Sequence, residues 1–245
     1  MPKRLLYTFI FLLSPFFLLQ SQIYYEGDPF YLLHYEKHIF QTGTSPASLL
    51  FRPFFQSMPK SYNNRWSLTA SAEYFDNDNA PNLENSSVRW IGKGVSRFSS
   101  LRFSYSGKFL SFSIEPYHFE NENLDYDVPV RKALYSKLND NRSHNEMPFI
   151  SSGIREAQLF IHHDGIGIGI SNANMWWGPG IHSSLQMTSN TVGFNYFSVG
   201  TIREKRISKL GIDLRYLFAP MDYGSSTESY FSALLLQIST YTEPV

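Results

Sequence analysis

The chain has 245 residues, and its 21 Lys and Arg residues balance its 21 Asp and Glu residues. Charged residues make up 17% of the sequence and aromatic residues another 17%, while the mean hydropathy is −0.26. This composition provides no basic face for nucleic acid and fits neither a disordered chain nor a helical membrane protein, and the absence of cysteine excludes disulfides and thiolate chemistry.

Residues 1–22 have the pattern of a secretory signal peptide. Lys3 and Arg4 precede an apolar run at 5–19, and small polar residues follow at 20–22. The apolar run is too short to span a bilayer comfortably. We therefore expect an exported protein that is cleaved near residue 22, with an uncleaved signal anchor as the alternative.

Residues 23–65 are expected to form a small N-terminal helical, plug-like element. A predicted short helix begins at Asp28 and continues to about Phe40, and the segment 43–46 ends it. The element is too short to be an independent domain. We expect it to pack on or inside the mouth of the structure that follows.

The segment 66–245 alternates apolar and polar residues with a period of two, which predicts antiparallel β-strands. We expect eight strands of about ten residues, the length that a tilted strand needs to cross a bilayer. The strands are predicted around residues 66–76, 100–105, 110–115, 158–162, 166–171, 197–199, 210–218 and 230–241.

Long and short connections are predicted to alternate between these strands. The long ones are expected at 77–97, 119–153, 174–193 and 219–229, and the short ones at 106–108, 164–165 and 203–207. Outer-membrane barrels have short periplasmic turns and longer external loops. The predicted fold class is therefore all-β: an antiparallel transmembrane outer-membrane β-barrel with aliphatic side chains outside, a soluble periplasmic β-sandwich or β-helix being the alternative.

One run of rare residues follows the strand at 166–171. It comprises Asn174, Trp176, Trp177, Gly178, Pro179 and Gly180, followed by His182, Ser183 and Asn190. The two glycines and the proline predict a rigid bend. The tryptophans offer flat surfaces that can stack on sugar rings, with the polar residues as hydrogen-bond partners; the alternative is that both tryptophans fill the interior or lie in an interfacial aromatic belt.

This run resembles the signature of the Wzi family of capsule-assembly proteins, over about thirty residues. The chain departs from that pattern at Ile181 and in the segment 191–194. The resemblance implies a non-catalytic, lectin-like outer-membrane protein that binds and anchors capsular or exopolysaccharide. Its partners would be that glycan, outer-membrane lipid and, as a further candidate, the capsule export machinery. The family also implies a barrel of more than eight strands, so we expect an incomplete N-terminal portion of a larger barrel, with a small complete barrel as the alternative.

Two other functions remain open from the sequence. In a porin or small-solute channel, Gly167, Gly169 and Gly211 would keep the interior open. An outer-membrane hydrolase would need a catalytic group, but His162 and His163 are adjacent on a strand and so point to opposite faces. We therefore expect no catalytic residue, no cofactor and no metal site.

Overall fold

The computed structural model describes an all-β protein. The residues that it describes are 24–25, 51–55, 65–81, 84–126, 148–163, 165–178, 183–184, 186–190, 192–202, 204–221 and 229–240. No helix among these residues has the length and hydrophobicity needed to cross a membrane. The helix expected at 28–40 lies outside the described residues.

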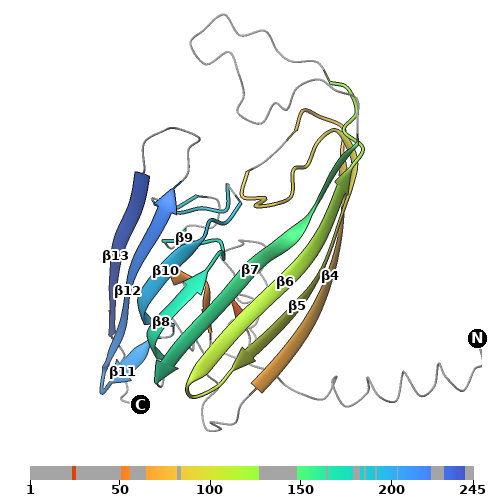
Figure 1. Cartoon of the computed structure of the whole chain (residues 1–245). Helices are drawn as coiled ribbons and strands as arrows, with labels where there is room; N and C mark the ends of the chain where they lie inside the picture. Colours follow the sequence, from red (N-terminus) through yellow and green to blue (C-terminus); the bar gives the residue numbers. More distant parts are fainter. Residues whose placement is uncertain are drawn as a thin grey trace, which may run out of the picture.

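A nine-stranded antiparallel sheet forms the body of the structure. Each long strand pairs with the next one along the chain, so the sheet is a meander (Figure 1). Its strands are β4 (Arg65–Asn77), β5 (Gly94–Ser106), β6 (Leu110–Asn121), β7 (Phe149–His163), β8 (Ile166–Ser171), β10 (Tyr196–Thr201), β11 (Lys205–Ile207), β12 (Leu210–Met221) and β13 (Ser229–Thr240). The predicted antiparallel all-β fold is confirmed at this level.

The sheet is curved, and β4 and β13 are its two edges. In Figure 1 these edges lie on opposite sides of the molecule, and no pairing between them is present in the described sheet. β10 and β11 both pair with the same side of β12, β11 continuing the line of β10. The segment 203–207, predicted to be a short turn, is therefore partly strand, and the turn lies at 208–209 instead.

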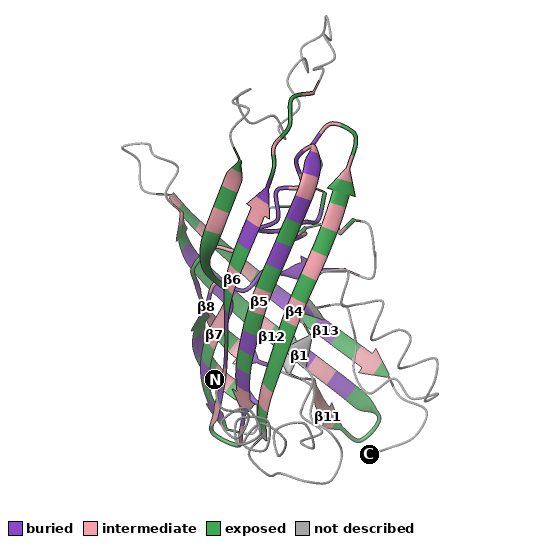
Figure 2. Cartoon of the chain, turned by 90° about the vertical axis from the view of Figure 1, so that its right-hand side faces the viewer, coloured by how far each residue is buried: buried purple, intermediate pink, exposed green. Residues whose placement is uncertain are grey.

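The two faces of the sheet differ in chemistry, as the period of two predicts. Along β5 the side chains of Arg102, Ser104 and Ser106 are buried on the concave face, while Leu101 and Phe103 are exposed on the convex face. Figure 2 shows this alternation as purple and green bands along the strands. The convex face carries a large set of exposed aliphatic and aromatic side chains, among them those of Leu68, Ile114, Ile161, Ile166, Ile168, Ile170, Leu214, Phe218, Leu234, Leu236 and Ile238.

The long connections all leave one end of the sheet, and the tight turns lie at the other end (Figure 1). The predicted alternation of long and short connections is thus confirmed. The strands β6 and β7 are longer than expected, so the loop between them spans 122–148 rather than 119–153.

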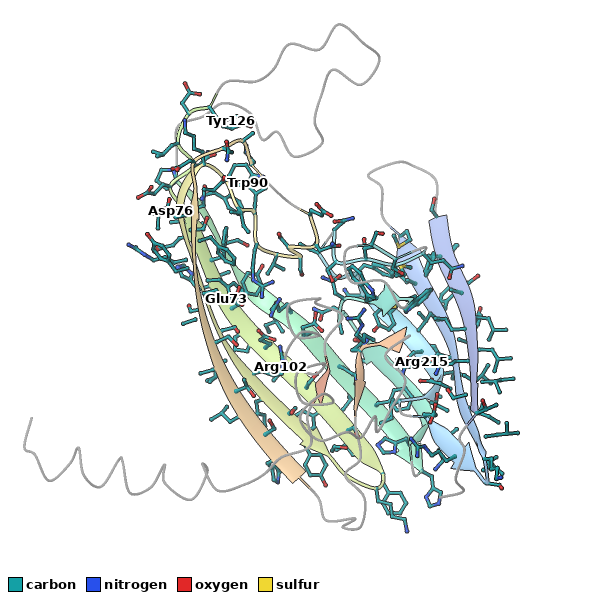
Figure 3. All side chains as sticks on the ribbon, turned by 180° about the vertical axis from the view of Figure 1, so that it is seen from behind. Glu73, Asp76, Trp90, Arg102, Tyr126 and Arg215 are labelled. Atoms are coloured by element: carbon teal, nitrogen blue, oxygen red, sulfur yellow. The ribbon has the colours of Figure 1, made fainter. Side chains whose placement is uncertain are left out.

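Short strands lie on the concave side of the sheet (Figure 3). β1 (Tyr24–Tyr25) pairs with β3 (Phe54–Phe55), and β2 (Phe51–Arg52) pairs with β9 (Trp176–Trp177), all antiparallel. The N-terminal segment therefore contacts the connection between β8 and β10, although the two are far apart in sequence.

Candidate functional site: the loop end and the concave face

The two tryptophans of the predicted site lie in the interior. Trp176 has 0% of its surface exposed and Trp177 has 5%. The guanidinium carbon of Arg52 lies 5.1 Å from the centre of the Trp176 ring, within the range of a cation–π interaction. Neither ring offers a free face to a sugar in this arrangement, so of the two roles considered for them the geometry favours the structural one.

Asn174 is the motif residue with the most informative contacts. Its backbone N–H donates to Glu156 Oε1 at 3.2 Å, and its side-chain Nδ2 donates to Ser87 Oγ at 2.6 Å. All three residues are buried. Asn174 thus joins the strand β7 to the connection between β4 and β5.

The remaining motif residues divide into three groups. Gly178 has a φ of 138°, which side-chain-bearing residues rarely adopt, and marks the predicted bend. Ser183 and Asn190 are exposed. Pro179, Gly180 and His182 lie outside the described residues.

The connections β4–β5 and β8–β10 are bonded to each other at the loop end of the sheet. Besides the Asn174–Ser87 bond, Ser87 N–H donates to the Ser189 carbonyl at 2.8 Å, and Asn85 N–H donates to Asn190 Oδ1 at 2.7 Å. We call this set of three contacts the loop clasp. It ties together two segments about a hundred residues apart, and the exposed Asn190 is one of its members.

The connection β4–β5 also folds onto the concave face. The guanidinium of Arg89, which is fully buried, makes two contacts of 2.8 Å with the Glu73 carboxylate. The same guanidinium lies 4.4 Å from the centre of the Phe98 ring, and that of Arg155 lies 4.9 Å from it. Two cations from different segments therefore contact one buried ring, which fixes the connection against the wall.

A buried ion network occupies the concave face below this loop. Glu115, which has 0% of its surface exposed, accepts hydrogen bonds from Arg102 and Arg155. Arg102 Nε lies 2.9 Å from Glu115 Oε2, and Arg155 Nη2 lies 2.9 Å from Glu115 Oε1. Because the carboxylate bonds both cations, its buried charge is compensated, as burial requires.

Glu156 joins this region through a β-bulge in β7. The pairing of β6 with β7 shifts register between Ser113 and Glu115, and Glu156 has a φ of 50°, in the left-handed region. A bulge adds one residue to one strand and re-aims side chains. Here the consecutive residues Arg155 and Glu156 are both buried, which an uninterrupted strand would not allow.

A second set of polar contacts anchors the N-terminal segment to β12. Arg215 donates from Nε and Nη2 to the Asp213 carboxylate, at 3.1 and 3.0 Å, and from Nη1 to the Pro53 carbonyl at 2.6 Å. Thr201 donates from its hydroxyl to Asp213. Figure 3 labels Arg215 and Arg102, which lie on the same concave side of the curved sheet.

Ser111 and His162 form a pair that resembles part of a catalytic dyad only in distance. Ser111 Oγ lies 2.8 Å from His162 Nε2, while His162 Nδ1 accepts the Gly165 N–H at 2.9 Å. An accepting Nδ1 leaves the proton of a neutral ring on Nε2, so Nε2 donates to the serine and cannot take its proton. His162 is buried and His163 exposed, as the sequence predicts for adjacent strand residues.

A small cavity lies on the concave side, among the described residues. This cavity of about 30 Å³ is lined by residues that include Pro53, Trp177 and Arg215. That volume suits about one water molecule rather than a sugar ring. Among the described residues no group of three or more His, Asp and Glu side chains is placed to hold a metal ion. His34 and His38 have the i, i+4 spacing that metal ligands can have on a helix, with a solvated helix face as the notable alternative, and both lie outside the described residues.

The sequence does not reveal several residues that organise this region. Ser87 and Arg89 fall in a predicted loop with no expected role. The one available signal is the occurrence of Arg89 and Trp90 inside an Asn-rich connection, where a charged and an aromatic side chain together are unusual. Comparisons of the chain with protein-family models, with curated proteins and with solved structures found no match.

Proposed function

We propose that the chain forms part of the wall of an outer-membrane β-barrel and holds capsular or exopolysaccharide at the cell surface, without catalysing a reaction. The observation that carries this proposal is the combination of an apolar convex face with long connections that gather, and bond to each other, at one end of the sheet. The resemblance of residues 174–190 to the Wzi family is the reason for choosing a surface polysaccharide as the ligand.

The chemistry of the convex face supports contact with lipid. β8 and β12 present aliphatic and aromatic side chains there, for example those of Ile166, Ile168, Leu214 and Phe218. Burial of one such side chain away from water stabilises by about 1.5–3 kcal/mol. A face of this size is unusual on a soluble monomer and favours a membrane partner.

The stagger of the tight turns supports the strand tilt of a barrel. His162 N–H donates to the Phe109 carbonyl, so the turn β5–β6 lies level with a point inside β7, above the turn at 164–165. Ile202 N–H donates to the Gly165 carbonyl, so the turn β7–β8 likewise lies above the turn at 208–209. Such a progressive shift is what closed, tilted sheets require.

Closure of the barrel would need partners for both edges. Unpaired backbone groups in hydrocarbon are costly, at several kcal/mol each. Because β4 and β13 lie on opposite sides of the curved sheet, we expect further strands to lie between them in the closed barrel.

The glycan would contact the exposed part of the loop end. Ser183 and Asn190 are exposed there, whereas Trp176 and Trp177 are buried. In this proposal the tryptophans, with Gly178, support the loop from below. The porin alternative is less well supported, because buried polar side chains and residues 51–55 lie on the concave face. Gly167 also has a local reason: a Cβ there would overlap the Ile161 carbonyl oxygen.

The test measures glycan retention in cells that produce the chain. In the double variant Ser183→Trp/Val192→Trp, two exposed positions of the loop end become bulky. Lys209→Trp places the same side chain on the tight turn at the other end and serves as the control. We expect released glycan to increase several-fold only with the double variant. Equal retention by both, with equal amounts of folded protein in the outer membrane, contradicts the proposal.

A channel is distinguished by conductance of the purified protein in planar bilayers. The proposal predicts a sealed interior, and a stable, open conductance would favour the porin. Slower gel migration after heating in detergent would report the closed barrel itself.

A further inference from the structure

The convex face of β5–β7 becomes polar at one register row. Ala72 pairs with Ser99, Ser99 with His118, and His118 with Ser152, so these residues lie side by side on four neighbouring strands. Ser99, His118 and Ser152 are all exposed. We call Ser99, His118 and Ser152 the polar row.

Below the polar row the same face is apolar. The next convex positions toward the tight turns are Leu101 on β5, Pro116 on β6 and Ile154 on β7, each exposed. Two residues further down lie Phe103 and Ile114, which pair with each other and are also exposed. The change in chemistry occurs at the same level on three strands. In the row above, exposed Tyr74 and Ile150 lie beside the charged pair Arg97 and Glu120, so that row is mixed.

Side chains in the polar row and in the row above it form hydrogen bonds with side chains on the adjacent strand. His118 Nδ1 lies 2.7 Å from Ser152 Oγ, and Arg97 Nη1 donates to Glu120 Oε1 at 3.0 Å. The side chains of Arg97 and Glu120 are 67% and 40% exposed. Charged groups this exposed would be costly in hydrocarbon and are well placed among hydrated headgroups.

The height of the polar row matches a membrane boundary. Ser99 precedes the tight turn at Gly107 by eight positions. At about 3.3 Å per residue and a tilt of about 40°, this corresponds to a rise of about 20 Å, just short of the apolar band of about 25 Å that outer-membrane barrels present to lipid. On β12, by contrast, the convex side chains from Leu210 to Pro220 are all aliphatic or aromatic.

We propose that the headgroup layer of the outer leaflet contacts the wall at the polar row, so that the upper parts of β4–β7 stand above the hydrocarbon. The inference rests on the proposed membrane function and adds the level on the wall at which the hydrocarbon ends and the headgroups begin. The partner is the phosphate-bearing, hydrated headgroup region of a bilayer. Its hydrocarbon contacts Leu101 and Ile154, and its polar groups contact Ser99, His118 and Ser152.

The absence of cysteine makes the experiment direct. Single-cysteine variants of the full chain, Ser99→Cys and Ser152→Cys, are labelled with bimane and reconstituted in phosphatidylcholine–phosphatidylglycerol vesicles. Leu101→Cys and Ile154→Cys, two residues away on the same strands, are the matched positions below the row. Leu234→Cys on β13 is the hydrocarbon reference. Quenching by lipids brominated in the middle of their acyl chains is measured for each.

We expect quenching at positions 101, 154 and 234 to be at least about threefold stronger than at 99 and 152, since bromine in the acyl chains quenches only nearby dyes. Equal, strong quenching at 99 and 152 would overturn the inference while leaving the membrane proposal intact. Absence of quenching at all five positions, including 234, would overturn the membrane proposal as well. Folding of each variant is checked by heat-modified gel migration.

Discussion

Asn174 and Ser87 meet through a buried hydrogen bond of 2.6 Å between Nδ2 and Oγ, although 87 positions separate them in the chain. The Glu156 carboxylate, on the bulge of β7, accepts the backbone N–H of Asn174 and so fixes the backbone there. Asn174, in the connection β8–β10, therefore links that connection both to the sheet and to the connection β4–β5. This sharing explains how long loops that leave separate strands can form one surface.

Substitution of Asn174 by alanine should weaken the loop clasp. The change leaves the buried Ser87 hydroxyl without its donor, and the loss of one partner of a buried hydrogen bond costs about 1–3 kcal/mol. A double-mutant cycle with Ser87→Ala, followed by urea unfolding of the detergent-solubilised protein, should show a coupling energy of about 1 kcal/mol.

Gln186→Ala, at an exposed position of the same connection, is the control and should leave the free energy of unfolding within about 0.5 kcal/mol of wild type. Strictly additive effects of Asn174→Ala and Ser87→Ala would mean that their hydrogen bond contributes nothing to the clasp.

Glu115→Gln should destabilise the sheet far more than the same change at Glu120. Glu115 is buried between Arg102 and Arg155, and breaking a buried ion pair from one side costs about 3–5 kcal/mol because the remaining charges lose their compensation. Glu120 pairs with Arg97 at the exposed surface, where such a pair contributes about 0–1 kcal/mol.

The measurement is the urea midpoint of both variants in the same detergent. Because the two substitutions are chemically identical and lie on the same strand, their difference reports burial alone. Similar midpoints for Glu115→Gln and Glu120→Gln would show that the network is accessible to water.

The sequence predicts the strands well where one apolar face is exposed and fails where other forces determine the strand. Around residues 166–170 and 210–218 the alternation is regular, and the strands lie where expected. In β7 the bulge at Glu156 interrupts the period of two, so the regular alternation covers only 158–162, whereas the strand begins at Phe149. The upper half of β6 escapes prediction because His118 and Glu120 are polar on the convex face.

The connection that carries the rare residues can be located from the sequence, but the orientation of those residues cannot. Residues 174–178 lie between β8 and β10, where the sequence predicts a long connection. Burial of Trp176 depends on Arg52 and on the pairing of β2 with β9, which are contacts between distant segments. Local sequence carries no information about such contacts, and the same holds for the contact of Arg89 with Phe98.

Gly167→Ala should disrupt the β7–β8 hairpin. A Cβ at Gly167 would overlap the Ile161 carbonyl oxygen and lie 2.6 Å from His162 Cα, so backbone must move. Overpacking of this kind costs about 1–3 kcal/mol. Gly153→Ala on the neighbouring strand β7, at a position paired with β6, is the control, since its nearest atom would be Tyr117 Cε1 at 3.3 Å, a side-chain atom that can shift.

Both glycine variants are compared by the temperature at which heat-modified migration is lost. A clear decrease is expected for Gly167→Ala and little change for Gly153→Ala. An unchanged temperature for Gly167→Ala would show that the hairpin accommodates a methyl group. Steric crowding would then not explain the glycine, and its role in the porin alternative would be favoured.

Trp176→Phe separates a structural role of the tryptophan pair from direct glycan contact. Phenylalanine keeps an aromatic ring over which the Arg52 guanidinium can lie, but it loses ring area in a fully buried site. We expect a loss of about 1–3 kcal/mol in the free energy of unfolding, by analogy with other large-to-small core substitutions. Trp176→Ala should cost more, about 3–5 kcal/mol.

Glycan retention is then measured beside stability, at a temperature where Trp176→Phe remains folded. If the ring acts only as a support, retention by folded Trp176→Phe should equal that of wild type, because the exposed residues of the loop end are unchanged. If the ring itself stacks on sugar, retention should fall even though the protein is folded. A further comparison with Arg52→Lys is informative: this variant keeps the charge but loses the planar group that lies over the indole, so a support role predicts reduced stability with retained glycan for Arg52→Lys as well.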